Sequence, residues 1–479
     1  PRLNLKQFLE DDQIPALEFS GISEVSYELE DGDLFLAVGN SAQIVEHIQE
    51  AERLGAVAAV VDRSQSSDIP RTRLPVFQID GLSNNRRLLA SRFFREPSND
   101  VDVVGITGTN GKTSVAYWIA DISNRLGIKT GYCGTLGWGA LENLKPSKLT
   151  TPNPTDIQRI LSWFVKEQFS RVALEVSSHA LHQGRTEAVK FTTGVFTNLS
   201  RDHLDYHKTM KAYARSKAKL FEEYELNSAI ICVDDSMGRE LAKTTVADVL
   251  TYGAKGDISW SVGNNSYGQE VIWNTPWGVL KSDAPFFCEF SIANLAAVIG
   301  VLLTAGFSIE QLGLVMPEIS QVPGRLETLN PDSDKGPIVI VDFAHTPSAV
   351  EAVLQSVSGM TQGKIISVLG CGGNRDQGKR SQMGEIVTRL SDLVWLTSDN
   401  PRSEAPEEII NQMTSEVEAT NFFVSIDREN AIRGAIHGAK KEDIVVLFGK
   451  GEETTQEING VFLPFKDKDV AEKILRGLG

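Results

Sequence analysis

A glycine-rich loop between an apolar strand and an amphipathic helix constrains the fold of this chain more than any other feature. The loop reads GITGTNGKTS over residues 105–114, and apolar side chains recur at helical spacing in residues 115–126. Its glycines let the backbone pass close to a phosphate chain, whose oxygens meet the N–H groups of the helix N-terminus. The pattern predicts a strand–loop–helix unit that binds a nucleoside triphosphate. The alternative is a glycine-rich turn before an ordinary helix.

Individual loop residues have distinct roles in this prediction. We expect Lys112 to reach the terminal phosphates and the Thr113 hydroxyl to help ligate Mg²⁺. The general phosphate-loop pattern is matched imperfectly, because five residues rather than four separate Gly105 from Gly111. The predicted loop contacts to ATP are Gly108, Thr109, Asn110, Gly111, Lys112, Thr113 and Ser114.

The composition of the chain restricts the class of protein. Its 479 residues are enough for about three domains, and 41% hydrophobic with 23% charged residues is ordinary for a globular protein. A net charge of −16 argues against nucleic acid as a partner. We find no apolar run near the roughly 20 residues that span a bilayer, and no signal-peptide core at residues 1–8. Four scattered cysteines indicate neither disulfides nor a zinc knuckle, so we expect a cytoplasmic enzyme.

The order of apolar runs predicts an α/β fold of three domains, at residues 1–98, 99–330 and 331–479. The central domain is expected to be a P-loop-type parallel sheet domain, and the C-terminal domain a doubly wound, Rossmann-like one. Segments 96–99 and 330–337 are the predicted linkers. The expected elements are strand 33–38, helix 44–54, strand 56–62, and strands 171–176, 193–199, 229–233, 338–341, 365–369, 393–396 and 444–448.

Two further polar clusters follow predicted strands. Glu175 ends one strand, where ligands of parallel sheets collect, and is placed to bind Mg²⁺; the alternative is a turn in which Ser177 and Ser178 cap a helix. His203 and His207 stand four residues apart, a spacing that can bind zinc, but the general-base Glu of H-E-x-x-H is missing. Their alternative is an ordinary hydrogen-bonding role.

These clusters together resemble the Mur ligase family, ATP-dependent enzymes that add amino acids to the peptidoglycan precursor. The resemblance runs from about residue 100 to the end of the chain, in seven blocks that keep the family's order. The blocks are GTNGKT (108–113), TTP (150–152), EVSSHALHQGR (175–185), NLSRDHLDYH (198–207), Y-x-x-x-K (213–217), PGRLE (323–327) and DFAHTP (342–347).

The resemblance implies roles for residues of the nucleotide site. Thr113 and Glu175 would serve one Mg²⁺ and His203 a second, with Lys217 as the family's carbamylated lysine. A plain lysine cation cannot ligate magnesium, whereas its CO₂ adduct presents anionic oxygens. The alternative for Lys217 is a solvated helix residue beside Lys211 and Lys219. On the nucleotide, the family's contacts match Asn294 on the adenine side, Arg325 and Asp342.

The UDP-linked acceptor, which the resemblance implies is UDP-MurNAc-L-Ala-D-Glu, is expected along a polar set of residues. Their hydroxyls, amide and guanidinium suit sugar, peptide and phosphate groups. The set consists of Thr150, Thr151, Ser177, Gln183 and Arg185. The N-terminal domain departs from the family: the usual D-S-R reads Val25-Ser26-Tyr27, and the usual D-G-H reads Gln43-Ile44-Val45. Only Ser26 and the GDLF strand carry over as uridine-side features.

The C-terminal blocks resemble the type that accepts meso-diaminopimelate, which is lysine with a carboxylate beside the distal ammonium. Arg375 and Arg402 can bind that carboxylate through charge-assisted forks, while Glu453 takes the ammonium. The matching positions also include Asn400, Pro401 and Gly449. The family commonly has His where Glu452 stands, and by itself Arg402 also fits a residue at the start of a helix.

The resemblance therefore predicts a ligase that joins meso-diaminopimelate to the acceptor through an acyl phosphate, in cytoplasmic peptidoglycan precursor synthesis. Its expected substrates and cofactor are ATP, UDP-MurNAc-L-Ala-D-Glu, meso-diaminopimelate and Mg²⁺. We expect a monomer, with no nucleic acid bound and no membrane insertion. The alternatives are a lysine-adding or folylpolyglutamate-type ligase, and a non-ligating NTP-binding homologue, which the altered uridine motif favours.

Overall fold

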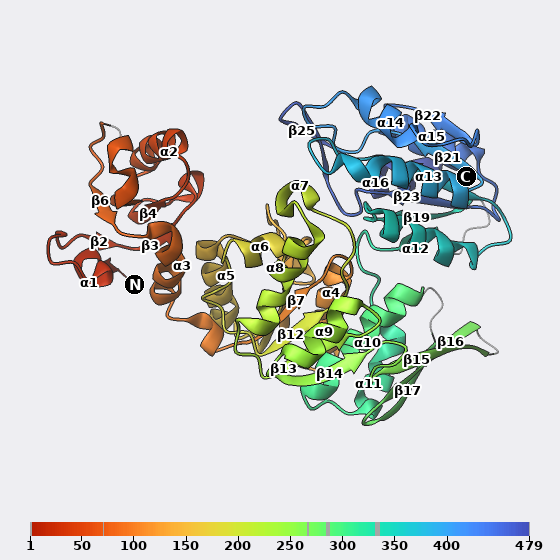
Figure 1. Cartoon of the computed structure of the whole chain (residues 1–479), viewed down its shortest axis with the longest axis horizontal. Coiled ribbons are helices and arrows are strands. Elements are labelled where there is room, and N and C mark those ends of the chain that lie inside the picture. The colour runs from red at the N-terminus through yellow and green to blue at the C-terminus, as the bar shows by residue number, and fades with distance from the viewer. Residues whose placement is uncertain (1, 70, 266–267, 284–287, 331–335, 479) are drawn as a thin grey trace. The chain divides into compact units, whose positions relative to one another are not determined.

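The computed structural model describes residues 2–69, 71–265, 268–283, 288–330 and 336–478 (Figure 1). The chain divides into two compact units, residues 1–105 with 129–192 and residues 106–128 with 193–479. Most of the linker predicted at 330–337 lies outside the described residues. The linker predicted at 96–99 is a packed 3₁₀ turn, in which the Ser98 hydroxyl accepts a hydrogen bond from the Lys190 N–H.

The first unit begins with a parallel sheet of order β3-β4-β5-β6. Alternate residues of β4 face opposite sides, so Leu34 and Leu36 join one buried cluster and Phe35 and Ala37 the other. The two strands and the helix predicted here are confirmed. The elements are α1 (Leu5–Leu9), β3 (Gly21–Ser23), β4 (Asp33–Ala37), α2 (Ser41–Arg53), β5 (Ala58–Asp62), β6 (Val76–Ile79) and α3 (Leu82–Phe93).

The largest sheet has the order β10-β9-β8-β11-β7-β12-β13-β14. Its β8–β11, β12–β13 and β13–β14 pairs are parallel, whereas β8, β9 and β10 form an antiparallel meander that the sequence patterns did not predict. Strands predicted at 171–176, 193–199 and 229–233 are present. The strands are β7 (Asp102–Thr107), β8 (Thr130–Gly134), β9 (Gly137–Ala140), β10 (Asn143–Lys145), β11 (Arg171–Glu175), β12 (Thr193–Phe196), β13 (Ser228–Cys232) and β14 (Asp248–Tyr252).

Helices cover these strands, and α10 packs against α4 in the second unit. A three-stranded antiparallel sheet of β15, β16 and β17, also absent from the prediction, packs beside α11 (Figure 1). The bounds are α4 (Lys112–Arg125), α5 (Pro154–Lys166), α6 (Ser178–His182), α7 (Leu204–His207), α8 (Met210–Glu222), α9 (Ser236–Thr244), β15 (Ser259–Asn265), β16 (Gly268–Thr275), β17 (Gly278–Asp283), α10 (Glu289–Thr304) and α11 (Ile309–Val315).

The C-terminal part of the second unit is a doubly wound sheet of order β18-β19-β23-β20-β21-β22, parallel except for β18. All four strands predicted here are present. The elements are β18 (Glu327–Leu329), β19 (Ile338–Asp342), α12 (Pro347–Ser358), β20 (Ile365–Leu369), α13 (Arg380–Leu390), β21 (Leu393–Leu396), α14 (Pro406–Thr414), β22 (Phe422–Val424), α15 (Arg428–Gly438), β23 (Ile444–Phe448), β24 (Thr455–Ile458), β25 (Val461–Pro464) and α16 (Asp467–Gly477).

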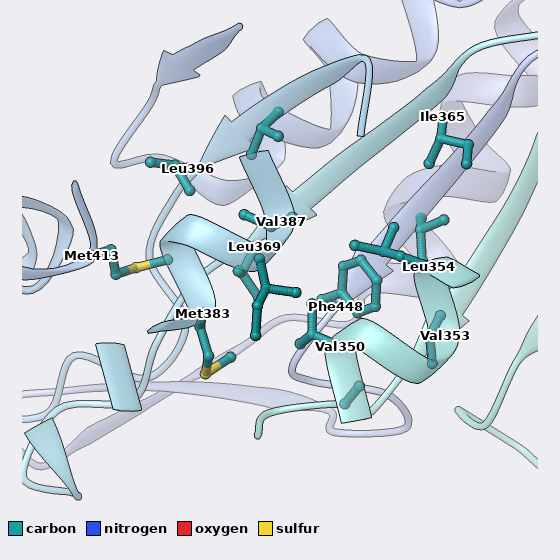
Figure 2. Packing of buried hydrophobic residues seen from close by; sticks show 14 of the residues in the cluster. Val350, Val353, Leu354, Ile365, Leu369, Met383, Val387, Leu396, Met413 and Phe448 are labelled. Atoms are coloured by element: carbon teal, nitrogen blue, oxygen red, sulfur yellow. The ribbon is translucent and has the colours of Figure 1, made fainter. Parts of the chain in front are cut away.

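Both faces of this sheet are covered. Figure 2 shows one face, where Val353 and Leu354 of α12 gather with Leu369 and Phe448 of the strands. The other face packs against α15 and α16, through buried residues such as Ile432. Each fully buried aliphatic side chain contributes roughly 1.5–3 kcal/mol. The two cores pack against both faces of β20, β21 and β23, and the predicted amino-acid residues follow the carboxyl ends of these strands.

Candidate active site

The predicted phosphate loop joins β7 to α4, so the strand–loop–helix prediction is confirmed. Gly108 has φ +151° and Gly111 has φ +89°. A Cβ at Gly108 would lie 1.8 Å from Thr197 Oγ1, and one at Gly111 would lie 2.4 Å from Asn294 Oδ1. Both positions therefore require glycine, for conformation and for space.

The loop is held from behind by the segment after β12. The Asn110 N–H donates to Asn198 Oδ1 at 3.0 Å, and the Thr197 hydroxyl donates to the Asn110 carbonyl at 2.6 Å. Lys112 Nζ donates to the Gly108 and Thr109 carbonyls at 2.9 and 3.0 Å. The predicted cation thus lies on the loop that it would serve.

Arg325 comes to the same helix start from a distant part of the chain. Its Nη2 donates to Thr113 Oγ1 at 3.2 Å, and its guanidinium lies 4.2 Å from the centroid of the Phe343 ring. Asp342, by contrast, accepts from the Leu326 and Ala344 N–H groups, both at 2.7 Å. Burial raises the pKa of Asp342. The structure brings Asn294, Arg325 and the loop together, and it shows Asp342 organising the backbone beside them.

Lys217 is buried, with 1% of its surface exposed, so the alternative of a solvated helix residue is wrong. Its Nζ donates to the Gly108 carbonyl at 2.8 Å and lies 4.5 Å from the centroid of the Tyr213 ring. Burial, and next the Lys112 charge, lower the pKa of Lys217 well below its usual range. The helical spacing of α8 turns Lys217 toward the loop while Lys219 stays partly exposed.

The carboxylate of Asp202 contacts basic side chains from three segments of the second unit. The sequence patterns did not predict these contacts. This carboxylate lies 3.3 Å from His203 Nε2, 3.5 Å from His345 Nε2 and 3.3 Å from Lys379 Nζ. Burial raises the pKa of Asp202, but the His345 hydrogen bond and these neighbouring charges bring it well below its usual range. His345 was visible within the DFAHTP block, but only the fold shows its partner.

The zinc alternative for His203 and His207 does not form. His207 is buried, and its Nδ1 lies 3.4 Å from the Ser216 hydroxyl, whereas His203 faces Asp202. Across the described ranges, no three His, Cys, Asp or Glu side chains are grouped to hold a metal ion. The helical part of the described chain likewise contains no segment long and apolar enough to cross a membrane.

In the first unit, Glu175 ends β11 with its carboxylate fully buried. Tyr132 Oη donates to Glu175 Oε1 at 2.5 Å, and the Thr135 N–H donates to the same oxygen at 3.0 Å. Thr135 Oγ1 also lies 3.2 Å from Thr150 Oγ1. The predicted carboxylate is therefore fixed at the end of its strand, as the sequence indicated.

The predicted acceptor residues gather around the end of this strand. Thr151 Oγ1 donates to the Glu175 carbonyl at 2.8 Å and lies 3.2 Å from Ser177 Oγ. Arg185 donates to the Thr151 carbonyl at 2.9 Å and through two nitrogens to Gln183 Oε1. Ser177 also caps α6, so the capped-turn alternative is correct as local structure.

In the N-terminal part of the chain, Ser26 is the residue predicted to contact the uridine. Ser26 is buried, and its hydroxyl donates to Glu50 Oε2 at 2.6 Å. The neighbouring Tyr27 is exposed, and Lys148 Nζ lies 3.8 Å from the centroid of its ring. The Ser26 hydroxyl therefore has an internal hydrogen-bonding role, and its contact with uridine stays a prediction.

The predicted amino-acid residues meet beyond β20, β21 and β23. Arg402, with φ +54°, places Nε 3.0 Å from Glu457 Oε2 and donates from Nη1 to the Gly373 carbonyl at 2.8 Å. A Cβ at Gly372 would lie 3.1 Å from Arg402 Nη1 and 3.6 Å from Arg375 Cγ. The two arginines that sequence analysis paired thus flank one glycine.

The acidic side of this residue cluster is also organised. Asn400 Nδ2 donates to Glu453 Oε2 at 2.8 Å, and the buried Lys450 lies 2.9 Å from the same oxygen. Gly449 needs its φ of +104° and its missing side chain, because a Cβ there would lie 2.6 Å from Asp399 Oδ2. Lys450 was not predicted, because only the fold shows that it neutralises Glu453.

Comparisons with known proteins cover most of the chain. Residues 106–302 match the Mur ligase middle domain, and residues 324–451 match the domain described as Mur ligase, glutamate ligase domain. The UDP-N-acetylmuramoyl-L-alanyl-D-glutamate–2,6-diaminopimelate ligase of Coxiella burnetii is 39% identical over 462 residues, 94% of each chain.

Solved structures agree with these matches. A UDP-N-acetylmuramoyl-L-alanyl-D-glutamate–2,6-diaminopimelate ligase superposes with a TM-score of 0.68 at 29% identity, covering 100% of this chain and 99% of that one. MurF ligase of Thermotoga maritima in complex with ADP superposes with a TM-score of 0.66 at 18% identity, over 95% and 97% of the chains. The second likeness supports the fold alone.

Proposed function

The chain belongs to the Mur ligase family, and on that premise we propose that it is an ATP-dependent ligase that joins meso-diaminopimelate to the D-glutamate of UDP-MurNAc-L-Ala-D-Glu. The observation that carries the proposal is the residue cluster in which Arg402 and Arg375 flank Gly372 while Asn400 Nδ2 donates to Glu453. We call this cluster the amino-acid pocket. Because ATP and a nucleotide-linked acceptor are its substrates, we infer a cytoplasmic location.

The pocket's charges suit the distal end of meso-diaminopimelate. The contacts of Arg402 to Glu457 and Gly373 engage two of its three guanidinium nitrogens, and a guanidinium has five N–H donors. A substrate carboxylate can accept charge-assisted hydrogen bonds from the arginines, and Glu453 can accept from the ammonium. Lysine lacks this carboxylate, and a site built to pair a polar group discriminates strongly against an analogue without it.

The ligation begins with attack of the D-glutamyl γ-carboxylate on the γ-phosphate of ATP, which gives an acyl phosphate and ADP. The amine of meso-diaminopimelate then attacks the acyl carbon, and the tetrahedral intermediate loses phosphate to leave the amide. The first step brings two anions together, so it requires fixed positive charge. Lys112 and Arg325 are the side chains of this chain that supply it beside the loop.

Mg²⁺ is the cofactor that the family implies, and the donor set fits it. In the second unit, the Thr113 hydroxyl and a carbamate on Lys217 are hard oxygen donors, and His203 adds a nitrogen. In the first unit, the Glu175 carboxylate is a donor of the same kind. Mg²⁺ is usually held in proteins by one or two side chains together with substrate phosphates and water, and the described residues form no cluster of three or more His, Cys, Asp or Glu ligands. When bound, the ion would offset phosphate charge.

The environment of Lys217 supports carbamylation. Its lowered pKa leaves more of the amine neutral, and the neutral amine is the form that attacks CO₂. The new N–C bond forms as a proton leaves the nitrogen, which yields an anionic carbamate. The buried amine at this position would thereby become an anionic oxygen ligand.

The test is ADP formation with ATP, Mg²⁺ and UDP-MurNAc-L-Ala-D-Glu, in the presence of meso-diaminopimelate, of L-lysine, or of neither. We expect ADP and a product of the tripeptide mass only with meso-diaminopimelate. A product formed with lysine alone would make the chain a lysine-adding ligase. Folded protein that binds ATP but forms no product with either amine would be a non-ligating homologue.

A further inference from the structure

Glu452 is paired with a lysine from another element. Its Oε1 lies 2.5 Å from Lys466 Nζ, and 30% and 21% of the two side chains are exposed. The backbone of this loop is closely packed, because a Cβ at Gly324 would lie 2.3 Å from the Glu452 nitrogen. Glu452 is thus fixed at both its backbone and its carboxylate, directly before Glu453 of the amino-acid pocket.

The position of Lys466 is not explained by its own helix. Lys466 is the N-cap residue of α16 and makes no side-chain cap. A cation at this end opposes the helix dipole, and Ser, Thr, Asp or Asn would satisfy the first N–H groups better. The following Asp467 pairs instead with the buried Arg428 at 2.6 Å. The contact that accounts for Lys466 is the one with Glu452.

A second ion pair ties the same helix start to the neighbouring backbone. Lys468 Nζ lies 2.6 Å from Glu327 Oε1, and Glu327 Oε2 accepts from the Gly324 N–H at 2.9 Å. Gly324 is the glycine against which the loop of Glu452 packs. The start of α16 is therefore tied by one lysine–glutamate pair to the loop of Glu452 and by another to Glu327, which binds the Gly324 backbone.

The charges explain why Glu452 needs a partner. Glu453 is paired with Lys450, and an unpaired carboxylate at Glu452 beside it would compete with Glu453 for the substrate ammonium. Lys466 neutralises that carboxylate. Glu452 then competes less with Glu453 for the ammonium.

We propose that the Glu452–Lys466 ion pair is a positioning device of the amino-acid pocket, which anchors residues 449–454 to α16 so that Glu453 meets the distal ammonium of the substrate. The proposal rests on the proposed function for the identity of that substrate. Glu452 and Lys466 are positioning residues: they act through Glu453, and neither contacts the reacting atoms.

The test is a double-mutant cycle of Glu452→Gln and Lys466→Gln. Each single variant is expected to raise the KM for meso-diaminopimelate about fivefold, while the double variant is no worse than either single one. The KM for the acceptor and kcat should change less than twofold. The charge-swapped variant Glu452→Lys with Lys466→Glu should recover part of the loss. Arg476→Gln is the matched control, because it breaks the exposed Glu472–Arg476 pair on the same helix.

A second readout does not depend on turnover. Amide hydrogen exchange of residues 449–455 should be faster in both single variants than in wild type and in Arg476→Gln. If Glu452 itself bound the ammonium, Glu452→Gln would raise KM while Lys466→Gln left it unchanged, and the proposal would be overturned. Unchanged exchange in all variants would also overturn it. Wild-type protein that does not ligate meso-diaminopimelate would instead refute the proposed function, with the exchange result still testing the anchor.

Discussion

The amino-acid pocket and the phosphate-loop region differ in whether their charged side chains are paired within the protein. In the pocket, Arg402 faces Glu457 and Glu453 faces Lys450. Near the loop, Lys217 is buried on a backbone carbonyl, and in the described part of the chain it makes no ion pair with a carboxylate. The difference matches the proposed ligands: a triphosphate brings its own negative charge, whereas an amino acid with two ammonium and two carboxylate groups brings none overall.

The comparison also separates two kinds of polar residue. Charged side chains that are paired within the protein are already held in place before the substrate binds. The entropic cost of ordering them on binding is therefore lower. A buried charge beside a like charge is poised for chemical change or for an anionic ligand. Substitutions at Lys217 should therefore act on turnover, and substitutions in the pocket should act on amino-acid affinity.

The largest effect is expected at Lys217. Lys217→Gln removes the group that we propose to be carbamylated and should lower kcat about 10²–10³-fold, the scale of losing one fixed electrostatic contact. Lys219→Gln, two residues along α8 and partly exposed, is the matched control and should stay within about twofold. Steady-state ADP formation measures both. Equal losses in the two variants would show that α8, and not the buried amine, is what turnover depends on.

A smaller effect is expected when the loop backbone is displaced. Gly108→Ala places a Cβ 1.8 Å from Thr197 Oγ1, so the loop must move and ATP affinity should fall about 10- to 100-fold. Gly306→Ala provides the contrast, because its φ of +93° is also strained but a Cβ there meets nothing within 4 Å. It should lose about 1 kcal/mol of stability and no ATP affinity. Calorimetric titration with ATP distinguishes the two, and matching affinities would contradict the steric account.

Sequence alone predicted the features whose causes are local. The glycines of the loop are required by backbone conformation and close packing over a few residues, so the motif carries them. The roles of Ser26 and Asp202 were not predictable, because their partners lie far along the chain: Glu50 for one, and His345 and Lys379 for the other. Four strands of the C-terminal sheet were predicted because they are continuous apolar runs, whereas the three-residue strands β18 and β22 were not predicted. The short, glycine-rich β8–β10 meander lacks that signal.

A further prediction tests whether a counter-charge offsets the cost of burying a carboxylate outside the pocket. Glu24 is paired with Arg86 at 3.0 Å, yet burial raises its pKa to about 7 from 4.5. The folded state therefore holds this proton more tightly, and the stability it contributes is present below about pH 4.5 and is lost as pH rises through 7. Glu24→Gln should remove roughly 3 kcal/mol of that pH dependence.

Urea unfolding of wild type and Glu24→Gln at pH 5, 6, 7 and 8 measures this dependence. Glu28→Gln, which removes an acid from the exposed Glu28–Lys148 pair nearby, is the control. Parallel stability curves for wild type and Glu24→Gln would mean that Arg86 offsets the burial of Glu24. The free-energy cost of burying the carboxylate and the stabilisation by its ion pair would then cancel here, as we infer for the amino-acid pocket.

The central claim is that Arg402, which is paired with Glu457 in the amino-acid pocket, makes the enzyme select meso-diaminopimelate over lysine. The most direct measurement is the ratio of kcat/KM for meso-diaminopimelate to that for L-lysine, in wild type, Arg402→Ala and the surface control Arg389→Ala. We predict a ratio of about 10³ or more in wild type and the control, and a fall of at least about tenfold in Arg402→Ala, mainly through KM for meso-diaminopimelate. A wild-type enzyme that uses lysine equally well, or an unchanged ratio in Arg402→Ala, would contradict the account.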